Sequence, residues 1–394
     1  MNVKANPGVV FPPGSTIGIF GSGQLGKMAA IAAKQMGYTV HVFSPDSNTP
    51  AGQVADLEIQ ASYTDVAAVE SFAKQVDVVT LEFENVPVEA LEAANKHAPV
   101  CPGAKTLATT QNRGLEKQLL VEQGIPTCQF KVVRSLDELV LAAEQLMPAI
   151  LKTTTDGYDG KGQYVIRNEA DLSLAWKTLG TDEAILEELI KFNFEFSVIG
   201  GRNSHGEFQA YPPIRNEHEN QILDVSFVPS GIESEVTDAA TKIVSQIMEQ
   251  LGTIGVLCVE FFYRDGEILV NEIAPRPHNS GHLTIEANET SQFEQQVRAV
   301  CGLPLGSTQL KTPAAMSNLL GQLWDSGQPA WEQAIAQPNV KLHLYGKEVP
   351  KANRKMGHLT ATAESSQQAV EQVIAARDSL PVNRSQNQER VVKA

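Results

Sequence analysis

The stretch Y-D-G-K-G-Q at residues 158–163 decides what kind of fold this sequence encodes. It follows a short apolar run that ends at Lys152, and it precedes the β-branched residues Val165 and Ile166. This pattern is typical of a loop between two strands. Glycines let the backbone turn tightly and approach a ligand closely, and a lysine between them adds a positive charge. We therefore predict a loop that covers a polyphosphate such as ATP.

Two glutamates farther along the chain, Glu260 and Glu272, supply the metal site that a polyphosphate needs. They lie on opposite arms of a hairpin predicted over residues 256–273, and both interrupt runs of apolar residues. Carboxylate oxygens are ligands that Mg²⁺ prefers. We therefore predict that the two carboxylates hold magnesium beside ATP. The alternative is a pair of unrelated carboxylates at the edge of a sheet.

The register of this hairpin decides whether the two acids can share a metal. A two-residue turn at Asp265 and Gly266 places Glu260 opposite Asn271, and Glu272 then faces the other side of the sheet. A three-residue loop with Gly266 in a bulge leaves Glu272 as the diagonal neighbour of Glu260, about 7–8 Å away between backbones. A shared metal therefore requires the three-residue loop, which we predict.

The composition is that of an ordinary globular protein. The chain has 394 residues, of which 42% are apolar and 20% charged, so two or three domains are expected. The net charge of −15 argues against nucleic acid or an anionic membrane as a partner. The four cysteines lack the spacing of a zinc site or a disulfide framework. Neither a signal peptide nor an apolar run of about 20 residues is recognisable, so we expect a cytoplasmic protein.

A second glycine-rich turn, G-S-G-Q-L-G at residues 21–26, separates a predicted strand from a helix predicted over residues 27–36. Gly23, Gln24 and Leu25 would then lie at a helix N-terminus, where anions bind. Three interpretations stay open: a dinucleotide fingerprint, a site for the phosphate or carboxylate of another ligand, or a turn without a ligand. We favour the second.

The order of the predicted elements divides the chain into three parts. Residues 1–112 alternate strands with helices, which is typical of a parallel sheet. Residues 113–193 form a small α+β unit that carries the 158–163 loop. Residues 194–394 contain longer, antiparallel strands and, after residue 312, one further strand at 341–345. We therefore predict a mixed α/β and α+β protein with a Rossmann-like N-terminal domain.

The segment A-P-R-P-H-N-S-G-H at residues 274–282 follows directly after the second glutamate. Its two prolines fix the path of the chain. Arg276 offers parallel N–H groups that match carboxylate or phosphate oxygens, so we predict that it binds a ligand. His278 either binds a ligand or only holds the loop by hydrogen bonds.

Taken together, these segments resemble the ATP-grasp superfamily and, within it, the N5-carboxyaminoimidazole ribonucleotide synthetases of purine biosynthesis. The resemblance extends from about residue 16 to 360 and includes T-L-E-F-E-N-V at 80–86 and R-K-M-G-H at 354–358. The R-P-H motif also occurs in formate-dependent glycinamide ribonucleotide transformylases, whereas Y-D-G-K-G-Q and R-K-M-G-H point to the carboxylating enzymes. The resemblance implies a pre-ATP-grasp domain (1–112), a small mobile lid (113–193), a larger C-terminal domain and a homodimer.

The resemblance also implies roles for individual residues. Those that would contact ATP are Arg113, Lys152, Gly157, Tyr158, Asp159, Gly160, Lys161, Gly162, Gln163, Glu187, Glu188, Leu189, Ile190, Glu195, His218, Asn271 and Glu272. Glu260 and Glu272 would bind magnesium, with two ions expected. Those that would bind aminoimidazole ribonucleotide and bicarbonate are Gly23, Gln24, Leu25, Tyr158, Asp159, Arg276, Lys347 and Arg354. Those that would act in catalysis are Asp159, Lys161, Arg276, His278, Lys347 and Arg354.

The implied reaction is a carboxylation that consumes ATP. Phosphorylation of bicarbonate by ATP would give carboxyphosphate. The exocyclic amine of aminoimidazole ribonucleotide would then attack either the carbon of carboxyphosphate or the carbon dioxide that it releases. Either Asp159 or His278 would interact with that amine. The products would be N5-carboxyaminoimidazole ribonucleotide, ADP and phosphate. Three alternatives remain: a sister ATP-grasp ligase such as the formate-dependent transformylase, an NAD-dependent dehydrogenase and a non-catalytic ATP-binding scaffold.

Overall fold

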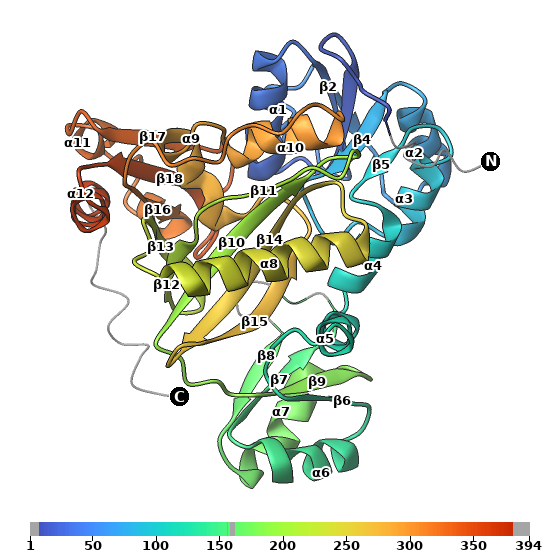
Figure 1. The fold of residues 1–394 in the computed structure, drawn as a ribbon, viewed down its shortest axis with the longest axis vertical. Helices are drawn as coiled ribbons and strands as arrows, with labels where there is room; N and C mark the ends of the chain where they lie inside the picture. Colours follow the sequence, from blue (N-terminus) through green and yellow to red (C-terminus); the bar gives the residue numbers. More distant parts are fainter. Residues whose placement is uncertain (1–7, 156, 158–161, 381–394) are drawn as a thin grey trace.

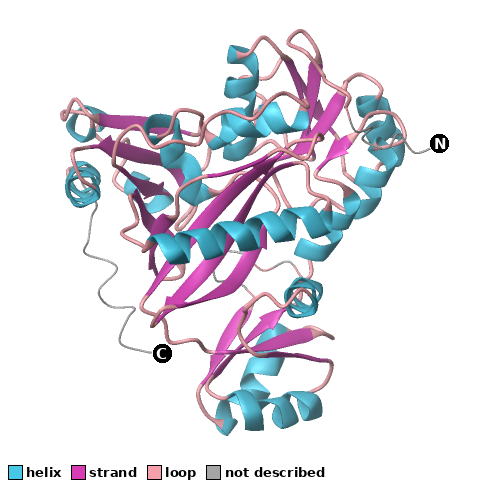
Figure 2. Cartoon of the chain, viewed as in Figure 1, coloured by secondary structure: helices cyan, strands magenta, loops and turns pink. Residues whose placement is uncertain are grey.

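The computed structural model describes residues 8–155, 157 and 162–380 of this chain. It contains one parallel and two antiparallel sheets (Figure 1), and helices pack on all three (Figure 2). The predicted combination of α/β and α+β architecture is therefore confirmed.

The first sheet is parallel throughout, with five strands in the order β3-β2-β1-β4-β5. This order is typical of a doubly wound, Rossmann-like fold. Strand β3 was missed in the sequence because its short stretch is only partly buried. The elements of this region are β1 (Thr16–Phe20), α1 (Gln24–Gln35), β2 (Thr39–Ser44), β3 (Leu57–Gln60), α2 (Val66–Ala73), β4 (Val78–Leu81), α3 (Val88–Ala94), β5 (Val100–Cys101) and α4 (Ala104–Thr110).

Alternation along β1 builds a core on each side of this sheet. Ile17 and Ile19 pack against α1 and, farther along the chain, against Phe293 of α10 (Gln292–Val300). Phe20 faces the opposite side and packs against Phe72 of α2. Because α10, which follows the hairpin of residues 255–274 in the chain, covers one face, the N-terminal sheet packs against the C-terminal part.

The second sheet is small and antiparallel, with the order β6-β9-β7-β8, and lies at the bottom of Figure 1. Two helices, α6 and α7, pack on it around a core of its own. The elements are α5 (Arg113–Glu122), β6 (Phe130–Val133), α6 (Leu136–Leu146), β7 (Ala149–Thr153), β8 (Gln163–Ile166), η1 (Glu169–Asp171), α7 (Leu172–Leu179) and β9 (Ala184–Glu188).

The third sheet is antiparallel, in the order β15-β14-β10-β12-β13-β16-β18-β17, with β11 beside β10. Helix α8 lies across β10 and β14 (Figure 1). The strands are β10 (Phe194–Arg202), β11 (Phe208–Ala210), β12 (Ile214–Glu219), β13 (Ile222–Val228), β14 (Gly255–Arg264), β15 (Glu267–Ala274), β16 (Ala314–Leu320), β17 (Val340–Leu344) and β18 (Lys355–Thr362). The remaining helices are α8 (Ser234–Leu251), η2 (Asn279–Leu283), α9 (Thr284–Ala287), η3 (Gly321–Trp324), α11 (Trp331–Ala334) and α12 (Ser366–Asp378).

The prediction of a single strand after residue 312 is wrong. Besides β17, the structure has β16 and β18, which pair with each other. Both strands are buried along almost their whole length. Strands buried on both faces lack the polar–apolar alternation that reveals a half-exposed strand, and this explains the error. Among the described residues, no helix combines the length and apolarity needed to cross a membrane.

Candidate active site

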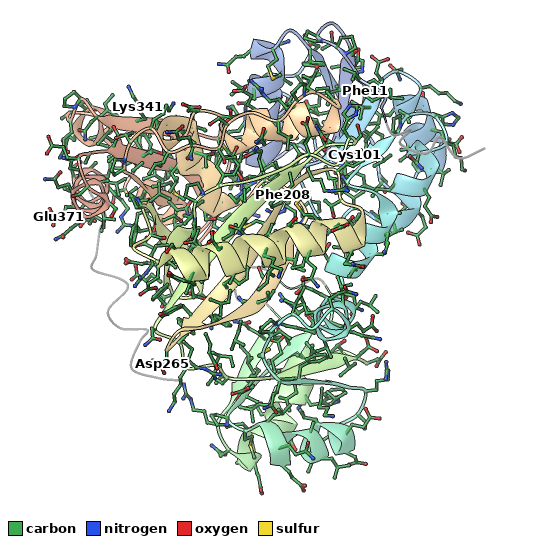
Figure 3. All side chains as sticks on the ribbon, in the orientation of Figure 1. Phe11, Cys101, Phe208, Asp265, Lys341 and Glu371 are labelled. Atoms are coloured by element: carbon green, nitrogen blue, oxygen red, sulfur yellow. The ribbon has the colours of Figure 1, made fainter. Side chains whose placement is uncertain are left out.

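The hairpin of β14 and β15 turns through two residues, so the predicted three-residue loop is wrong. Arg264 pairs with Glu267, and Asp265, at the tip of the hairpin (Figure 3), and Gly266 have φ values of 50° and 93°. Positive φ at both positions is characteristic of a type I′ turn, which the Asp-Gly sequence favours. The turn by itself would place the two glutamates on opposite faces.

A β-bulge in the middle of the hairpin nevertheless brings the glutamates together. Phe261 pairs with Val270, but the next pair is Glu260 with Glu272, so Asn271 is an extra residue in β15. An extra residue changes which side of the sheet the following side chains face. Both carboxylates therefore lie on one face, although the bulge is at Asn271 and not in the turn.

Glu260 forms an ion pair with His278. Nε2 of the imidazole lies 2.9 Å from Oε1 of Glu260, and Nδ1 lies 2.9 Å from Oγ of Ser280. Burial disfavours the imidazolium, but the neighbouring Cys258 and Glu260 outweigh burial and raise the pKa of His278 to about 10. His278 likewise overcomes the effect of burial on Glu260 and lowers its pKa to about 2. In this arrangement His278 is a cation, which favours anion binding over proton acceptance.

Arg276 is held by Glu84, a residue whose role the sequence did not reveal. Nε and Nη2 of the guanidinium donate to the two carboxylate oxygens of Glu84, and Nη1 donates to the carbonyl oxygen of Pro277 at 3.1 Å. The exposed fractions of the two side chains are 17% for Arg276 and 26% for Glu84. Glu84 belongs to the 80–86 motif, where two acidic residues, Glu82 and Glu84, closely follow a buried strand and were the available signal.

The glycine turn before α1 binds a carboxylate of the protein itself. The backbone N–H groups of Gly23 and Gly26 donate to Glu82 at 2.7 and 3.2 Å. Gly21 has a φ of 100°, and a Cβ there would come within 2.5 Å of the Glu82 side chain. Burial raises the pKa of Glu82. The N–H groups of the turn thus bind an anion, but in this structure that anion is Glu82 and not the ligand that we predicted. Glu82 is a further residue whose role the sequence did not reveal, and binding of a ligand at this turn stays a prediction.

The loop between β17 and β18 carries Lys347 and Arg354 and contacts α1. Lys27, in the first turn of α1, donates through Nζ to the carbonyl oxygen of Tyr345 at 3.0 Å. Lys347 donates to the carbonyl oxygen of Lys355 at 2.6 Å, and Arg354 donates to a carbonyl group of the same loop. The fold therefore brings this basic loop next to the helix that follows the glycine turn.

Helix α5 connects the first sheet to the second and begins with Arg113. Asn112 caps the helix by accepting a hydrogen bond from the N–H of Leu115. Nη1 of Arg113 lies 3.2 Å from Oε2 of Glu272, and Nη2 donates to the carbonyl oxygen of Gly157 at 3.3 Å. One guanidinium thus connects a predicted metal ligand to the predicted phosphate loop.

Lys152 of β7 and Glu187 of β9 form a buried ion pair of 2.6 Å. Burial raises the pKa of Glu187, but the attraction of Lys152 outweighs it and lowers the pKa to about 2. The other carboxylate oxygen, Oε1, is buried and has no hydrogen-bond partner among the described residues. A buried acceptor without a partner is unfavourable, so this oxygen is suited to a donor group of a ligand. The predicted contacts Glu188, Leu189 and Ile190 follow directly at the end of β9.

Glu195 of β10 and His218 of β12 form a second pair on the third sheet. Nδ1 of His218 lies 2.7 Å from Oε2 of Glu195. Burial lowers the pKa of His218, but the hydrogen bond and charge of Glu195 outweigh it and raise the pKa. Both residues were predicted from the resemblance to line the nucleotide site, and the structure brings them into direct contact.

The predicted phosphate loop is described only at its ends. The residues that lie outside the described part of the chain are Tyr158, Asp159, Gly160 and Lys161. Gly162 has a φ of 70° and accepts a hydrogen bond from the N–H of Thr153 at 2.9 Å. Gln163 donates to the side chain of Gln221 at 2.8 Å, which links the small sheet to the third sheet.

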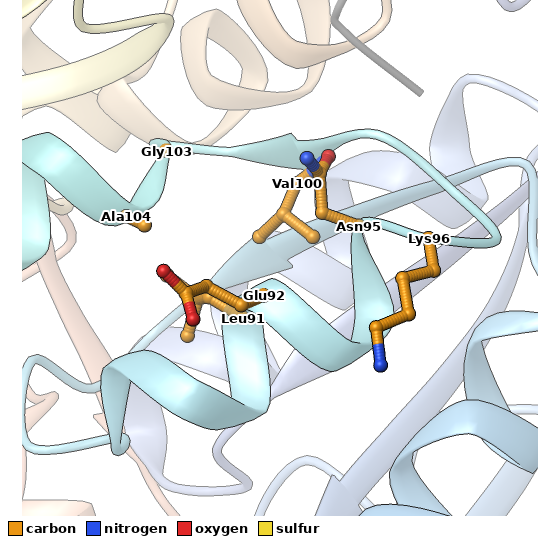
Figure 4. A pocket seen from close by; sticks show the side chains of 7 residues that line it. All are labelled: Leu91, Glu92, Asn95, Lys96, Val100, Gly103 and Ala104. Atoms are coloured by element: carbon orange, nitrogen blue, oxygen red, sulfur yellow. The ribbon is translucent and has the colours of Figure 1, made fainter. Parts of the chain in front are cut away.

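No set of three or more His, Cys, Asp or Glu side chains in the described ranges could hold a metal alone. The pair Glu260 and Glu272 is therefore a two-carboxylate set. A separate pocket of about 370 Å³ lies on the N-terminal region between α3 and the start of α4 (Figure 4). It shares no residue with the candidate active site; its lining consists of Leu91, Glu92, Asn95, Lys96, Val100, Gly103 and Ala104.

Three known protein families match successive parts of the chain. Residues 15–111 match the ribonucleotide synthetase preATP-grasp domain, residues 118–293 the ATP-grasp domain, and residues 314–372 the phosphoribosylaminoimidazole carboxylase C-terminal domain. The N5-carboxyaminoimidazole ribonucleotide synthase of Bacillus subtilis is 44% identical over 363 residues, which are 92% of this chain and 95% of that protein. The chain belongs to the N5-carboxyaminoimidazole ribonucleotide synthase family. The resemblance inferred from the sequence motifs is confirmed.

Solved structures of this family superpose on more than nine-tenths of the chain. An N5-carboxyaminoimidazole ribonucleotide synthetase in complex with ADP is 44% identical, with a TM-score of 0.89 over 94% of this chain and 98% of that one. The Aspergillus clavatus N5-carboxyaminoimidazole synthase in complex with ADP and 5-aminoimidazole ribonucleotide is 29% identical, with a TM-score of 0.84 over 93% and 98%. The family's ATP-grasp fold is thus shared from the first sheet to the last.

Proposed function

We propose that this protein carboxylates 5-aminoimidazole ribonucleotide with bicarbonate and ATP. The products are N5-carboxyaminoimidazole ribonucleotide, ADP and phosphate, and the reaction belongs to purine biosynthesis. One observation carries the proposal. The carboxylates of Glu260 and Glu272 and their cationic partners, His278 and Arg113, lie together where β15, α5 and the 274–282 loop meet. The complex of the Aspergillus relative with ADP and 5-aminoimidazole ribonucleotide supports the choice of substrates.

Magnesium fits the carboxylates Glu260 and Glu272, and we propose two ions there. The bulge places the two side chains opposite each other. Mg²⁺ in nucleotide sites is usually held by one or two carboxylates together with phosphate oxygens, without a complete protein cage. In this structure the cations of His278 and Arg113 balance the charges of the two carboxylates. A divalent cation would take the place of these two partners. When bound, magnesium supplies charge neutralisation for phosphoryl transfer.

The nucleotide would lie between the second and third sheets. We propose that Arg113 and Lys152 bind its phosphates, together with Gly157, Tyr158, Asp159, Gly160, Lys161, Gly162 and Gln163. The unpaired Oε1 of Glu187 would accept a hydrogen bond from the amino group of adenine. Glu188, Leu189 and Ile190, which follow in the same segment, would also contact ATP. Glu195, His218 and Asn271 would complete the site around the ribose and phosphates.

Bicarbonate and the ribonucleotide would occupy the side formed by the 274–282 loop and the first sheet. Arg276 and the cationic His278 would neutralise the charge that develops on carboxyphosphate. Lys347, Arg354 and the turn containing Gly23, Gln24 and Leu25 would bind the ribonucleotide. Asp159 and His278 remain our two candidates to accept a hydrogen bond or proton from the amine. Closure of the small lid would exclude water, which otherwise hydrolyses the mixed anhydride.

Phosphate release provides the test. We expect rapid ADP and phosphate formation only when ATP, Mg²⁺, bicarbonate and 5-aminoimidazole ribonucleotide are all present. Release that instead requires formate and glycinamide ribonucleotide would refute the carboxylation and favour the transformylase. Nucleotide binding without substrate-stimulated turnover would favour a scaffold, and a change in nicotinamide absorbance would favour a dehydrogenase.

We further propose a cytoplasmic homodimer with domain limits at residues 1–112, 113–193 and 194–394. The one parallel and two antiparallel sheets support these limits because each sheet falls within one of the three ranges. Light scattering of the purified protein would measure its mass; a value near that of one 42.6 kDa chain would refute the dimer.

A further inference from the structure

The bulge at Asn271 needs support, because β15 is the edge strand of the third sheet. On one side β15 pairs with β14. On its other side the described residues provide no further strand of the sheet, only an isolated parallel bridge between Val270 and Thr127, in which the N–H of Val270 donates to the carbonyl oxygen of Pro126 at 2.8 Å. An edge strand is held by a ladder on one side only, so its register is less firmly fixed than that of a central strand. An extra residue also leaves ladder groups unpaired. Whatever fixes the bulge also fixes Glu272 opposite Glu260.

Lys117 of α5 provides one support, although nothing in the active-site chemistry described above uses it. The side chain is 1% exposed. Its ammonium donates to the carbonyl oxygens of Asn271 at 2.7 Å and Val270 at 3.2 Å. The third hydrogen bond, of 2.9 Å, goes to Oγ1 of Thr127, which itself donates to the Val270 carbonyl at 2.8 Å. All three donors of the buried lysine are thus used, two of them on the bulge.

Glu116, the preceding residue, provides the other support. It is 3% exposed, and its Oε2 accepts a hydrogen bond from the backbone N–H of Ile273 at 3.0 Å. The two neighbouring side chains of α5 therefore bind carbonyl groups before Glu272 and an N–H group after it. Burying a polar group is unfavourable unless it forms hydrogen bonds, and here the partners of Lys117 and Glu116 include the backbone on either side of Glu272.

We infer that Lys117 and Glu116 are positioning residues that clamp the β15 bulge and thereby keep Glu272 opposite Glu260. The metal role of these carboxylates rests on the proposed function, whereas the clamp rests on the hydrogen bonds alone. Without the clamp, a regular ladder from the two-residue turn would pair Glu260 with Asn271 and turn Glu272 to the other face.

Backbone hydrogen exchange in the nucleotide-free protein tests the clamp directly. In Lys117→Met, which keeps the length of the side chain but removes its donors, we expect amide exchange in the β15 peptide to rise at least tenfold. Lys117→Arg, which keeps donor groups, should restore most of the protection. Gln118→Met is the matched control, since Gln118 is the next residue of α5 and is exposed; its exchange should equal that of the wild type.

Glu116 provides a second pair of variants in case Lys117→Met does not fold. Glu116→Gln retains an acceptor for the N–H of Ile273 and should protect β15 as the wild type does, whereas Glu116→Met should not. If the amides of β15 exchange at the wild-type rate in folded Lys117→Met or in Glu116→Met, the clamp is overturned.

The consequence for the carboxylates is measured as the affinity for manganese, which binds in place of magnesium in the presence of ADP. Electron paramagnetic resonance follows this binding. Clamp variants should weaken manganese binding at least tenfold while the exposed control does not. Loss of β15 protection with unchanged manganese affinity would overturn the positioning role. If Glu260→Gln also leaves manganese affinity unchanged, the metal assignment of the proposed function fails instead, and the exchange data still decide the clamp.

Discussion

Substitution of Glu84 by glutamine should impair catalysis through Arg276. The guanidinium donates two charge-assisted hydrogen bonds to the Glu84 carboxylate, and glutamine keeps only one acceptor oxygen. A hydrogen bond to a charged group contributes about 1.5–3 kcal/mol, and the 17% exposure of Arg276 leaves little solvent to replace it. If the loss falls on the transition state, kcat/KM should decrease about 10- to 100-fold.

The assay is ADP release at saturating ATP and Mg²⁺, with bicarbonate and 5-aminoimidazole ribonucleotide varied in turn. The matched control is Glu70→Gln, because Glu70 also pairs with a cation, Lys96, at 3.1 Å, but on the surface. Exposed ion pairs contribute little, so this control should change kcat/KM less than twofold. Unfolding by urea, measured in parallel, separates a loss of catalysis from a loss of folded protein.

A double-mutant cycle decides whether Glu84 acts through Arg276. In the Arg276→Gln background, Glu84→Gln should cause little further loss, since coupled residues are not additive. Two losses that simply add would refute the coupling. An effect of Glu84→Gln no larger than that of Glu70→Gln would refute the importance of the contact altogether.

Three further predictions follow from the candidate active site. The pKa of Glu187 is lowered to about 2, so this group contributes up to about 3 kcal/mol to the free energy of unfolding above its unfolded pKa. The contribution is lost as the pH falls from about 4.5 to 2. Urea unfolding of Glu187→Gln should therefore show a weaker loss of stability across this pH range than the wild type. Glu260→Gln and Glu272→Gln should each raise the Mg²⁺ concentration required for half-maximal ADP release at least tenfold, and chelation by EDTA should stop release until Mg²⁺ is restored. Gly281→Ala should destabilise the fold by about 1–3 kcal/mol, because the new Cβ would lie 2.3 Å from a buried isoleucine, whereas Gly103→Ala, with nothing within 4 Å, should be nearly neutral.

Local patterns predicted those elements whose signal lies within one short segment. Helix α8, which the pattern predicts over residues 234–251, has the predicted bounds. Its apolar period is clear, and Gly252 with a φ of 65° ends it. Strands β16 and β18 were missed because they are buried on both faces. In such strands every position can be apolar or small, and the period of two disappears.

The sequence by itself determined the family, the mixed architecture and the residue types of the candidate active site, since motifs and hydrophobic periods are local properties of the chain. Tertiary structure alone decided which charges meet. Glu84 contacts Arg276 across 192 positions of sequence, and Lys117 reaches the carbonyl of Asn271 across 154. The face on which Glu272 lies depends on a single extra residue in β15. A register is fixed by hydrogen bonds from elements distant in the sequence, and no pattern within the hairpin contains them.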